Sequence, residues 1–222
     1  NIAPNVTIAG QTAPGDGVTL YGDGIGFSGA HNSITRFIRF RMGVNGTTDK
    51  DAVSIDTGHD MIFDHITASW GRDETFSISG SNPTNITIQS SVISQGLQTH
   101  SAGGLIQTYG GVSILRSLYM DNGTRNPKVK GVNEFVNNVV GNWESIGYIM
   151  GGDSEGEHFA NVFDNYFIRG PASSDNPIGS GNTDFHIYRA NNWYDSNRNG
   201  ILDGADLAVA KYGEHDAQAS PF

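Results

Sequence analysis

The 222-residue chain contains no cysteine, so no disulfide framework holds it together. No stretch approaches the roughly 18 consecutive apolar residues that a transmembrane helix needs, which excludes a membrane span. Basic residues are also scarce, because 13 Lys and Arg stand against 23 Asp and Glu and give a net charge of −10. Affinity for nucleic acid comes mainly from Lys and Arg, so general nucleic-acid binding is not expected.

Glycine and asparagine, by contrast, are abundant. The 30 Gly, 7 Pro and 20 Asn make long helices improbable, since these residues disfavour helix interiors. The 11 Phe, 8 Tyr and 3 Trp suffice for one sizeable core. The length fits a single all-β domain over residues 1–222. The sequence begins at Asn1 with neither Met nor an apolar signal segment, so we expect a mature or trimmed chain.

Short apolar runs recur along the chain at a nearly constant interval. Taking one anchor residue in each run gives spacings of 26, 26, 26, 21, 27 and 27 for Arg39, His65, Ser91, Ser117, Asn138, Asn165 and Asn192. A unit of about 26 residues with short strands and Gly/Asn corners predicts a right-handed parallel β-helix, with coils about 4.8 Å apart. The alternative is an antiparallel β-sandwich, but the Asn-Gly and Asp-Gly hairpin turns that it favours are mostly missing.

The last three anchors are all asparagine, which predicts a stacked amide ladder at one corner of the solenoid. No helical pattern that would cover either open end is apparent in the sequence. A β-helix needs its ends covered, so we expect the chain to be a fragment of a longer β-helix.

One group of acidic residues lies about one coil apart in the sequence. Asp49 and Asp51 precede an apolar run, and Asp73 follows 22 residues after Asp51, with Glu74 next to it. Stacked coils would bring these carboxylates to one face, where hard oxygen ligands suit Ca²⁺. The alternative is a set of solvated loop acids.

Basic residues are concentrated in one segment. Arg116, Arg125, Lys128 and Lys130 fall within fifteen residues, and Pro127 restrains the chain between the last three. We expect this rigid segment to hold an anionic ligand; the alternative is a basic surface turn.

Three segments in order resemble the pectate lyase family of polysaccharide lyases. They are the Asp-Ala-x-x-Ile segment 51–55, the apolar-Asp-His strand 61–67 and the Arg-x-Pro segment 124–130. The stretches 5–10 and 100–105 also resemble family members. The resemblance covers about residues 5 to 170 and implies a right-handed parallel β-helix. It further implies a secreted, monomeric enzyme that cleaves α-1,4-linked polygalacturonate (pectin) by Ca²⁺-dependent β-elimination.

The resemblance assigns a role to residues of the basic segment. Arg125 matches the proton-abstracting arginine of the family, and Lys130 matches a residue that binds uronate carboxylate. Lys128 and Arg116 are further candidates for substrate binding. His100 falls near a substrate-binding lysine of many members, and a histidine is also the conventional alternative for the base. An arginine base needs nearby cations and exclusion of water, because its reference pKa exceeds 12.

The acidic residues match metal ligands of the family less completely. Asp51 and Asp73 match two calcium ligands, but the family usually has a third acid where this chain has Ser77. We expect Glu74, Asp49 or a backbone oxygen to compensate, or else a weaker calcium site. His65 belongs to the Asp-His strand, whose role in the family is mostly packing.

A second calcium site is predicted in the loop 195–206. Its spacing matches an EF-hand loop, with Asp195, Asn197, Asn199, Ile201, Asp203 and Asp206 at ligand positions 1, 3, 5, 7, 9 and 12. Asp in place of Glu at position 12 and the lack of flanking helices leave a plain Asp/Asn/Gly corner as the alternative.

Two other functions compete with the lyase. A β-helical polygalacturonase would hydrolyse the same polymer with a pair of carboxylates. A non-catalytic pectin-binding β-helix would need no base at all.

Overall fold

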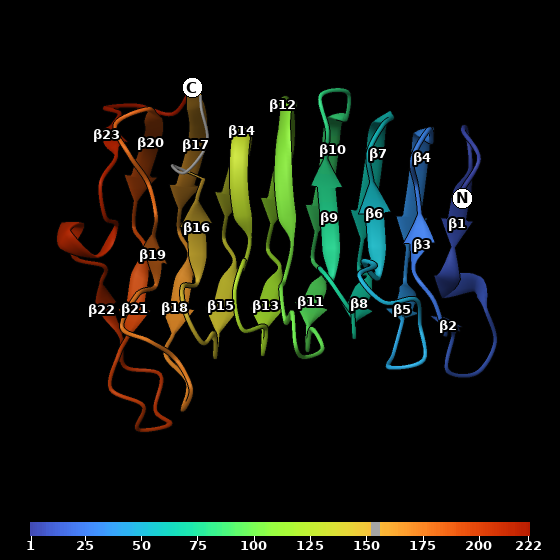
Figure 1. Ribbon diagram of the computed structural model, residues 1–222, viewed down its shortest axis with the longest axis horizontal. Helices are drawn as coiled ribbons and strands as arrows, with labels where there is room; N and C mark the ends of the chain where they lie inside the picture. Colours follow the sequence, from blue (N-terminus) through green and yellow to red (C-terminus); the bar gives the residue numbers. More distant parts are fainter. Residues whose placement is uncertain (152–155) are drawn as a thin grey trace.

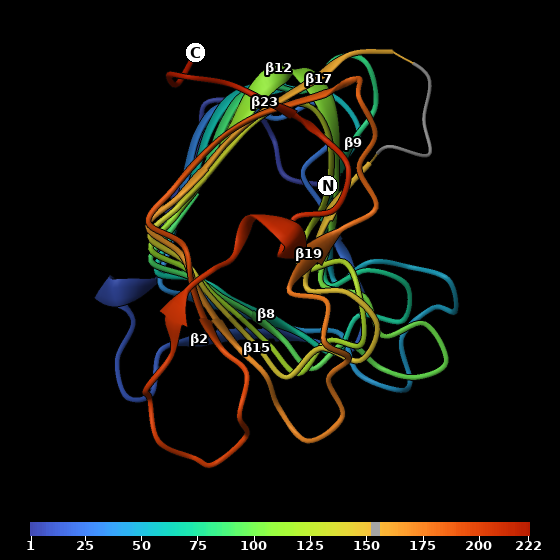
Figure 2. The ribbon, with the colours of Figure 1, turned by 90° about the vertical axis from the view of Figure 1, so that its left-hand side faces the viewer.

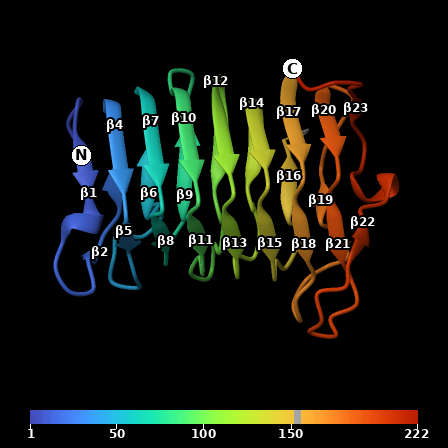
Figure 3. The same ribbon diagram turned by 180° about the vertical axis from the view of Figure 1, so that it is seen from behind.

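The computed structural model describes residues 1–151 and 156–222. Strands dominate it, and the described part of the chain holds no α-helix, only the 3-10 turns η1 (Gly10–Thr12) and η2 (Val209–Lys211). No helix in these residues is long and apolar enough to cross a membrane. The strands stack side by side along one long axis as a right-handed parallel β-helix (Figures 1 and 3), which confirms the predicted fold.

Two sheets run the length of the solenoid, and their coils superpose when viewed along the axis (Figure 2). The nine-stranded sheet contains β2 (Val18–Tyr21), β5 (Ile38–Arg41), β8 (Thr67–Ser69), β11 (Val92–Ser94), β13 (Leu118–Met120), β15 (Val139–Gly141), β18 (Tyr166–Ile168), β21 (Trp193–Asp195) and β22 (Ala205–Asp206). Within the described residues its strands are parallel except for the pair β21 and β22.

The fourteen-stranded sheet bends into two faces. One face contains β1 (Thr7–Ala9), β4 (His31–Arg36), β7 (His59–Asp64), β10 (Thr84–Gln89), β12 (Leu105–Leu115), β14 (Lys128–Val136), β17 (His158–Phe163), β20 (Phe185–Ala190) and β23 (Asp216–Ala217). The other adds β3 (Ile25–Gly26), β6 (Val53–Ile55), β9 (Phe76–Ser79), β16 (Tyr148–Met150) and β19 (Ile178–Gly179) to the long strands β12 and β14.

The sharp corner between the two sheets has the same backbone conformation in the seven coils from β4–β5 to β20–β21. One residue adopts a positive φ of 47–57°: Phe37, His65, Ser90, Arg116, Asn137, Asp164 and Asn191. A non-glycine residue in this region costs about 1 kcal/mol, so the corner must be stabilised by other contacts. The following residue turns its side chain inward and supplies them.

The asparagine ladder at this corner is confirmed. Asn138 donates from Nδ2 to Asn165 Oδ1 at 3.2 Å, and Asn165 donates in the same way to Asn192 Oδ1 at 3.0 Å. Backbone amides join the ladder, since the N–H groups of Asn138 and Asn165 donate to the same oxygens at 2.8 and 3.1 Å. All three side chains are buried, so their amide groups form the hydrogen bonds that buried backbone groups at the corner cannot form with water.

The ladder continues toward the N-terminus through Ser117 and Ser91, but the first two predicted anchors are wrong by one residue. Thr67 pairs with both Arg39 and Val92, which places Ile66 next to Ser91 in the column. His65 is instead the exposed corner residue before it, and Arg39 lies outward on β5. In sequence, Asp64 and His65 resemble the polar anchors of the other coils, but the buried Ile66 occupies the ladder position.

Apolar side chains stacked in register fill the interior. Phe27, Phe63 and Phe76 follow one another with ring centroids 4.8 and 5.0 Å apart in edge-to-face contact. Such pairs contribute about 0.5–1.5 kcal/mol beyond burial of their area. The same core continues through Ile106, Phe135 and Tyr148, and it fixes the backbone from which the charged residues of the outer face project.

Candidate functional site

Loops that follow the nine-stranded sheet lead into β6, β9, β12 and β14, and their last residues meet on one edge of the solenoid. Figure 2 shows these loops projecting from a single corner. Glu74 lies at this edge, bridged in parallel to Ala102, and Ala102 is bridged to Thr124. Residues separated by 22 to 28 positions therefore become neighbours.

Glu74 and Arg125 form an ion pair at the centre of this edge. The Glu74 side chain is only 5% exposed and that of Arg125 is 28% exposed. The two residues lie 51 positions apart, on coils that are not adjacent. An ion pair this buried holds the guanidinium in a fixed place, because either partner alone would be a poorly solvated charge.

The backbone around Arg125 is held by a buried amide pair. Asn122 donates from Nδ2 to Asn126 Oδ1 at 2.9 Å, and Asn126 donates back to the Asn122 carbonyl at 3.2 Å. Gly103 lies against this turn, where a Cβ would come within 2.5 Å of the Arg125 carbonyl oxygen. The Gly103-Gly104 motif thus allows the close approach that presents Arg125 outward.

Asp51, which lies on the previous coil, is the third carboxylate near this edge. Its Oδ1 accepts a hydrogen bond from the Glu74 backbone N–H at 3.0 Å. Burial, together with the negative charges of Glu74 and Asp73, raises the pKa of Asp51 to about 7. Three carboxylates crowded in this way favour a cation among them.

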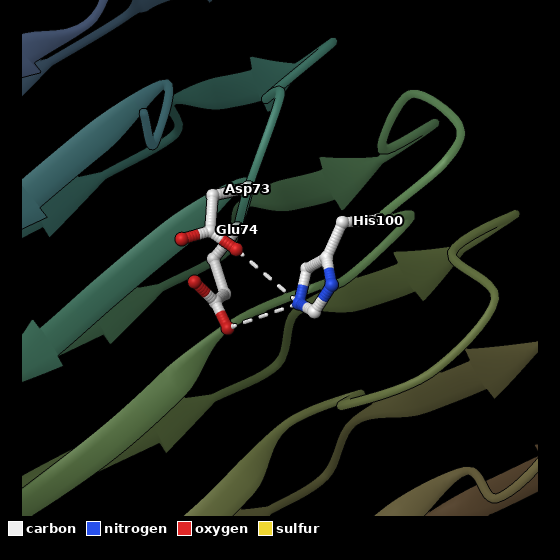
Figure 4. Close-up of side chains that lie close together, drawn as sticks. All are labelled: Asp73, Glu74 and His100. Atoms are coloured by element: carbon white, nitrogen blue, oxygen red, sulfur yellow. Dashed lines mark ion pairs between the residues drawn. The ribbon is translucent and has the colours of Figure 1, made fainter. Parts of the chain in front are cut away.

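His100 reaches the same group from the loop before β12 (Figure 4). Its Nε2 lies 3.2 Å from Asp73 Oδ1 and 3.9 Å from Glu74 Oε1. Among the described residues, Asp73, Glu74 and His100 are the group of potential ligands close enough to hold a metal ion. Asp73 and His100 are half-exposed, so this side of the site faces solvent.

The two lysines follow Arg125 along β14. Strand alternation turns Lys128 and Lys130 outward while Val129 is buried between them. Lys128 lies beside Leu105, and Lys130 lies beside Gln107 on the neighbouring strand. The structure therefore brings Asp51, Asp73, Glu74, His100 and Arg125 together, with both lysines on the adjoining strand.

Three other residues considered in the sequence lie elsewhere. Arg116 occupies the corner between β12 and β13 and donates to Gln89 Oε1 at 3.4 Å, away from the carboxylates. Ser77 is buried on β9, and its hydroxyl accepts the Leu105 N–H at 3.3 Å. Asp49 is exposed in the loop before β6, and the buried Glu74 is the carboxylate that joins Asp51 and Asp73.

His65 lies on the far corner and has contacts typical of packing. Its Nδ1 is 2.7 Å from Asp64 Oδ1, and its ring stacks on Phe37 at 4.7 Å. The buried Asp64 also accepts hydrogen bonds from Arg36 and Gln89.

The loop 195–206 is closed by the antiparallel pairing of β21 with β22. Asp203 accepts from the Nδ2 groups of Asn197 and Asn199 at 2.8 and 3.1 Å, and its N–H donates to Asp195 Oδ2 at 3.4 Å. The amide oxygens of Asn197 and Asn199 accept the N–H groups of Asn199 and Ile201. Five of the six predicted ligands are thus connected, while Asp206 is exposed on β22.

The donor chemistry at the first site fits a metal ion, since ligand atoms of Asp73, Glu74 and His100 lie within 4.8 Å of one another. Asp51 adds a third carboxylate from the adjacent coil, and positive charge would relieve the repulsion among the three. Ser77 is not oriented as a ligand, since it serves the β9–β12 ladder.

Fold and site together define the class: a parallel β-helix with a mixed acidic and basic site on one outer edge. Probable pectate lyase C of Neosartorya fischeri is 58% identical over 209 residues, which are 94% of this chain and 50% of that protein. The proteins of the same name from Aspergillus fumigatus and Aspergillus flavus are 57% and 56% identical over 94% and 97% of the chain. No protein-family model matches.

These similarities extend over nearly the whole chain, so the chain belongs to the pectate lyase family. The chain spans about half the length of these curated relatives, at 50–52% of each.

The ion pair between Glu74 and Arg125 was not predicted from the sequence. Glu74 was a candidate metal ligand and Arg125 a candidate base, and no repeat spacing links residues 51 positions apart. A signal was present in the spacing of Glu74, Ala102 and Thr124, which follows the coil length, but it becomes visible only once the register is known.

Proposed function

We propose that this chain is the catalytic β-helix of a secreted, calcium-dependent pectate lyase that cleaves α-1,4-linked polygalacturonate. The observation that carries the proposal is the ion pair between the buried Glu74 carboxylate and Arg125. Asp51 and Asp73 lie beside this pair, and the lysines of β14 lie next to it. One edge then presents both an anionic group for a cation and a cationic group for uronate carboxylates. The family of the chain supports the same reaction.

Each residue has a defined task in β-elimination. In its neutral form, Arg125 takes the proton from C5 of the uronate, the electron pair forms the C4–C5 double bond, and the C4–O bond breaks. The departing oxygen takes up a proton from water. Lys128 and Lys130 bind the uronate carboxylates along the outer face of β14. Their charges stabilise the negative charge that develops beside C5.

Asp51, Asp73 and Glu74 are the residues that would hold Ca²⁺. When bound, the ion supplies positive charge beside the uronate carboxylate and beside Arg125. Glu74 has a second task, because its ion pair orients Arg125 toward the outer face, and a cation held by Glu74 would favour the neutral form of Arg125 that accepts the proton. The acidic protein and its acidic polymer thus associate through a local cation, despite the net charge of −10.

An assay for the unsaturated product tests the function. Polygalacturonate incubated with the chain and calcium should gain the ultraviolet absorbance of the C4–C5 double bond, and chelator should abolish the gain. Arg125→Ala should lower the rate by roughly 10²–10⁴-fold, as loss of a general base does. Arg36→Ala is a matched control, since Arg36 pairs with the buried Asp64 on the far corner.

Three outcomes would contradict the proposal in different ways. Shortened polymer without new absorbance would indicate a hydrolase. Binding without any cleavage would indicate a non-catalytic pectin-binding protein. Near-normal elimination by folded Arg125→Ala would move the base to another residue, with His100 the first to test.

A further inference from the structure

The metal-binding group contains one donor that a calcium site does not call for. Calcium in proteins is held by oxygen atoms, whereas imidazole nitrogen suits ions such as Zn²⁺, Co²⁺ and Ni²⁺. Here His100 directs Nε2 at both Asp73 and Glu74, as Figure 4 shows. The donor set is therefore one nitrogen and two carboxylates, in place of oxygens alone.

The separations between the donor atoms suit a small ion. Ligands that lie about 2.0–2.1 Å from a tetrahedral zinc ion are about 3.3 Å from one another. The distance from His100 Nε2 to Asp73 Oδ1 is 3.2 Å, and all three donor atoms lie within 4.8 Å of each other. Because Asp73 and His100 are half-exposed, their side chains can adjust to close the remaining gap to Glu74.

The backbone on both sides of this group is fixed. The Ser101 hydroxyl accepts the Gly123 N–H at 3.0 Å, and Ala102 is bridged to both Glu74 and Thr124. His100 therefore projects from a loop whose next two residues are anchored and buried. Arg125 contacts the same Glu74 oxygen, Oε1, that faces His100, but a carboxylate accepts at about four positions, so Oε1 keeps a second acceptor position and Oε2 remains for the ion.

We propose that Asp73, Glu74 and His100 form a site for a first-row transition-metal ion of the Zn²⁺, Co²⁺ or Ni²⁺ type. The ion competes with Ca²⁺ for the two carboxylates. The inference extends the proposed function, because it concerns the same carboxylates, but the binding itself requires no substrate and no turnover. The consequence is selectivity between cations, because His100 supplies the one nitrogen ligand and so decides whether the site prefers a transition-metal ion to Ca²⁺.

Calorimetric titration of the chelator-treated protein tests this site with Zn²⁺, Co²⁺ and Ca²⁺, each used alone. The wild type should bind Zn²⁺ and Co²⁺, and the bound Co²⁺ should show visible absorption bands typical of nitrogen ligation. His100→Ala should weaken Zn²⁺ and Co²⁺ binding at least tenfold and change Ca²⁺ affinity less than threefold. His100→Gln, which offers an oxygen in place of the nitrogen, should behave in the same way.

His59→Ala is the matched control. His59 is also half-exposed and also pairs with an acid, at 2.7 Å from Asp60. Its removal should leave all three affinities unchanged. Each variant is checked for an unchanged melting temperature in chelator.

Equal Zn²⁺ affinity in the wild type and His100→Ala would overturn the proposal and leave the His100–Asp73 contact as an ion pair only. Failure of the lyase is a separate result, because it would appear as missing elimination in calcium while Zn²⁺ binding still depended on His100. Ca²⁺ affinity that fell together with Zn²⁺ affinity in both His100 variants would also overturn the selectivity.

Discussion

At the scale of single residues, the pairing of Glu74 with Arg125 has the largest consequence. Both charges are largely removed from water, so the favourable term is their mutual contact, and each alone is unfavourable. The pair therefore links two properties that are usually separate, namely the stability of the outer edge and the position of the guanidinium.

We predict that Glu74→Gln lowers the free energy of unfolding by about 3 kcal/mol, because it leaves a half-buried guanidinium without its carboxylate. Chemical denaturation of Glu74→Gln, Arg125→Met and the double variant measures this as a cycle. The double variant should be less destabilised than the sum of the two single variants. Additive effects would mean that the two side chains do not interact energetically.

Asp51 gives a prediction about pH. Its pKa is raised to about 7 in the folded chain by burial and by Glu74 and Asp73, above the ordinary value of 3.8. The stabilising effect of the protonated form is complete below pH 3.8 and is lost as the pH rises through about 7. In chelator, Asp51→Asn should therefore gain stability relative to wild type as the pH rises from 3.8 to about 7. Melting temperatures of both proteins measured in parallel would contradict this if their difference stayed constant.

At the scale of elements, the corner ladder carries much of the register. Asn165 donates to the Phe135 carbonyl at 2.7 Å and to Asn192 Oδ1, and it accepts the Asn138 N–H. It thus connects three consecutive coils with one side chain. A strand slipped by one residue would break all of these bonds at once.

Asn165→Ala should cost about 2–4 kcal/mol of unfolding free energy, because it leaves buried backbone groups of two coils unsatisfied. Asn45 is exposed in the loop before β6 and does not have a positive φ. Asn45→Ala should therefore change the stability by no more than about 0.5 kcal/mol. Equal effects of the two substitutions, measured by urea denaturation, would show that the ladder adds nothing beyond an exposed amide.

The loop 195–206 is an element whose metal binding we propose from its spacing and its connected acids and amides. Calcium that binds only the folded chain raises the melting temperature. Asp203→Asn with Asp206→Asn should remove part of this rise while elimination at saturating calcium stays nearly normal. Asp184→Asn, an exposed acid outside the loop, serves as the control. An unchanged calcium response in the double variant would identify the loop as a plain turn.

At the scale of the whole molecule, the net charge opposes binding of the proposed ligand, whereas the arrangement of basic residues on one edge favours it. The chain carries a net charge of −10, yet its proposed ligand is a polyanion. The solenoid presents Arg125 and the lysines of β14 on one edge, so attraction is local while repulsion is general.

In chelator, we expect binding of polygalacturonate to strengthen as monovalent salt rises from about 10 to about 150 mM. The Debye length falls from about 30 to about 8 Å over this range, which screens the repulsion between the two net charges more than the close contacts. Retention on immobilised polygalacturonate measures the effect. Weaker binding at higher salt would mean that the basic edge dominates even over long distances.

The sequence by itself determined the repeat, the parallel β-helix and the asparagine ladder. Each of these follows from a local pattern that recurs in every coil, and in-register stacking converts it directly into structure. The same holds for the gathering of Asp51, Asp73 and Glu74, since they lie about one coil apart. The prediction failed at His65, because the corner residue there is polar and the ladder residue that follows it, Ile66, is apolar.

The tertiary structure alone decided which charged groups meet. Glu74 contacts Arg125 across 51 positions, His100 joins Asp73 from a loop, and Arg116 lies at the opposite end of β13 from the loop that carries Arg125. The loops between coils differ in length, so the repeat of the sequence does not fix where their side chains point. Only the complete stack of coils, which holds each loop against the backbone of the next, places these charges within contact of one another.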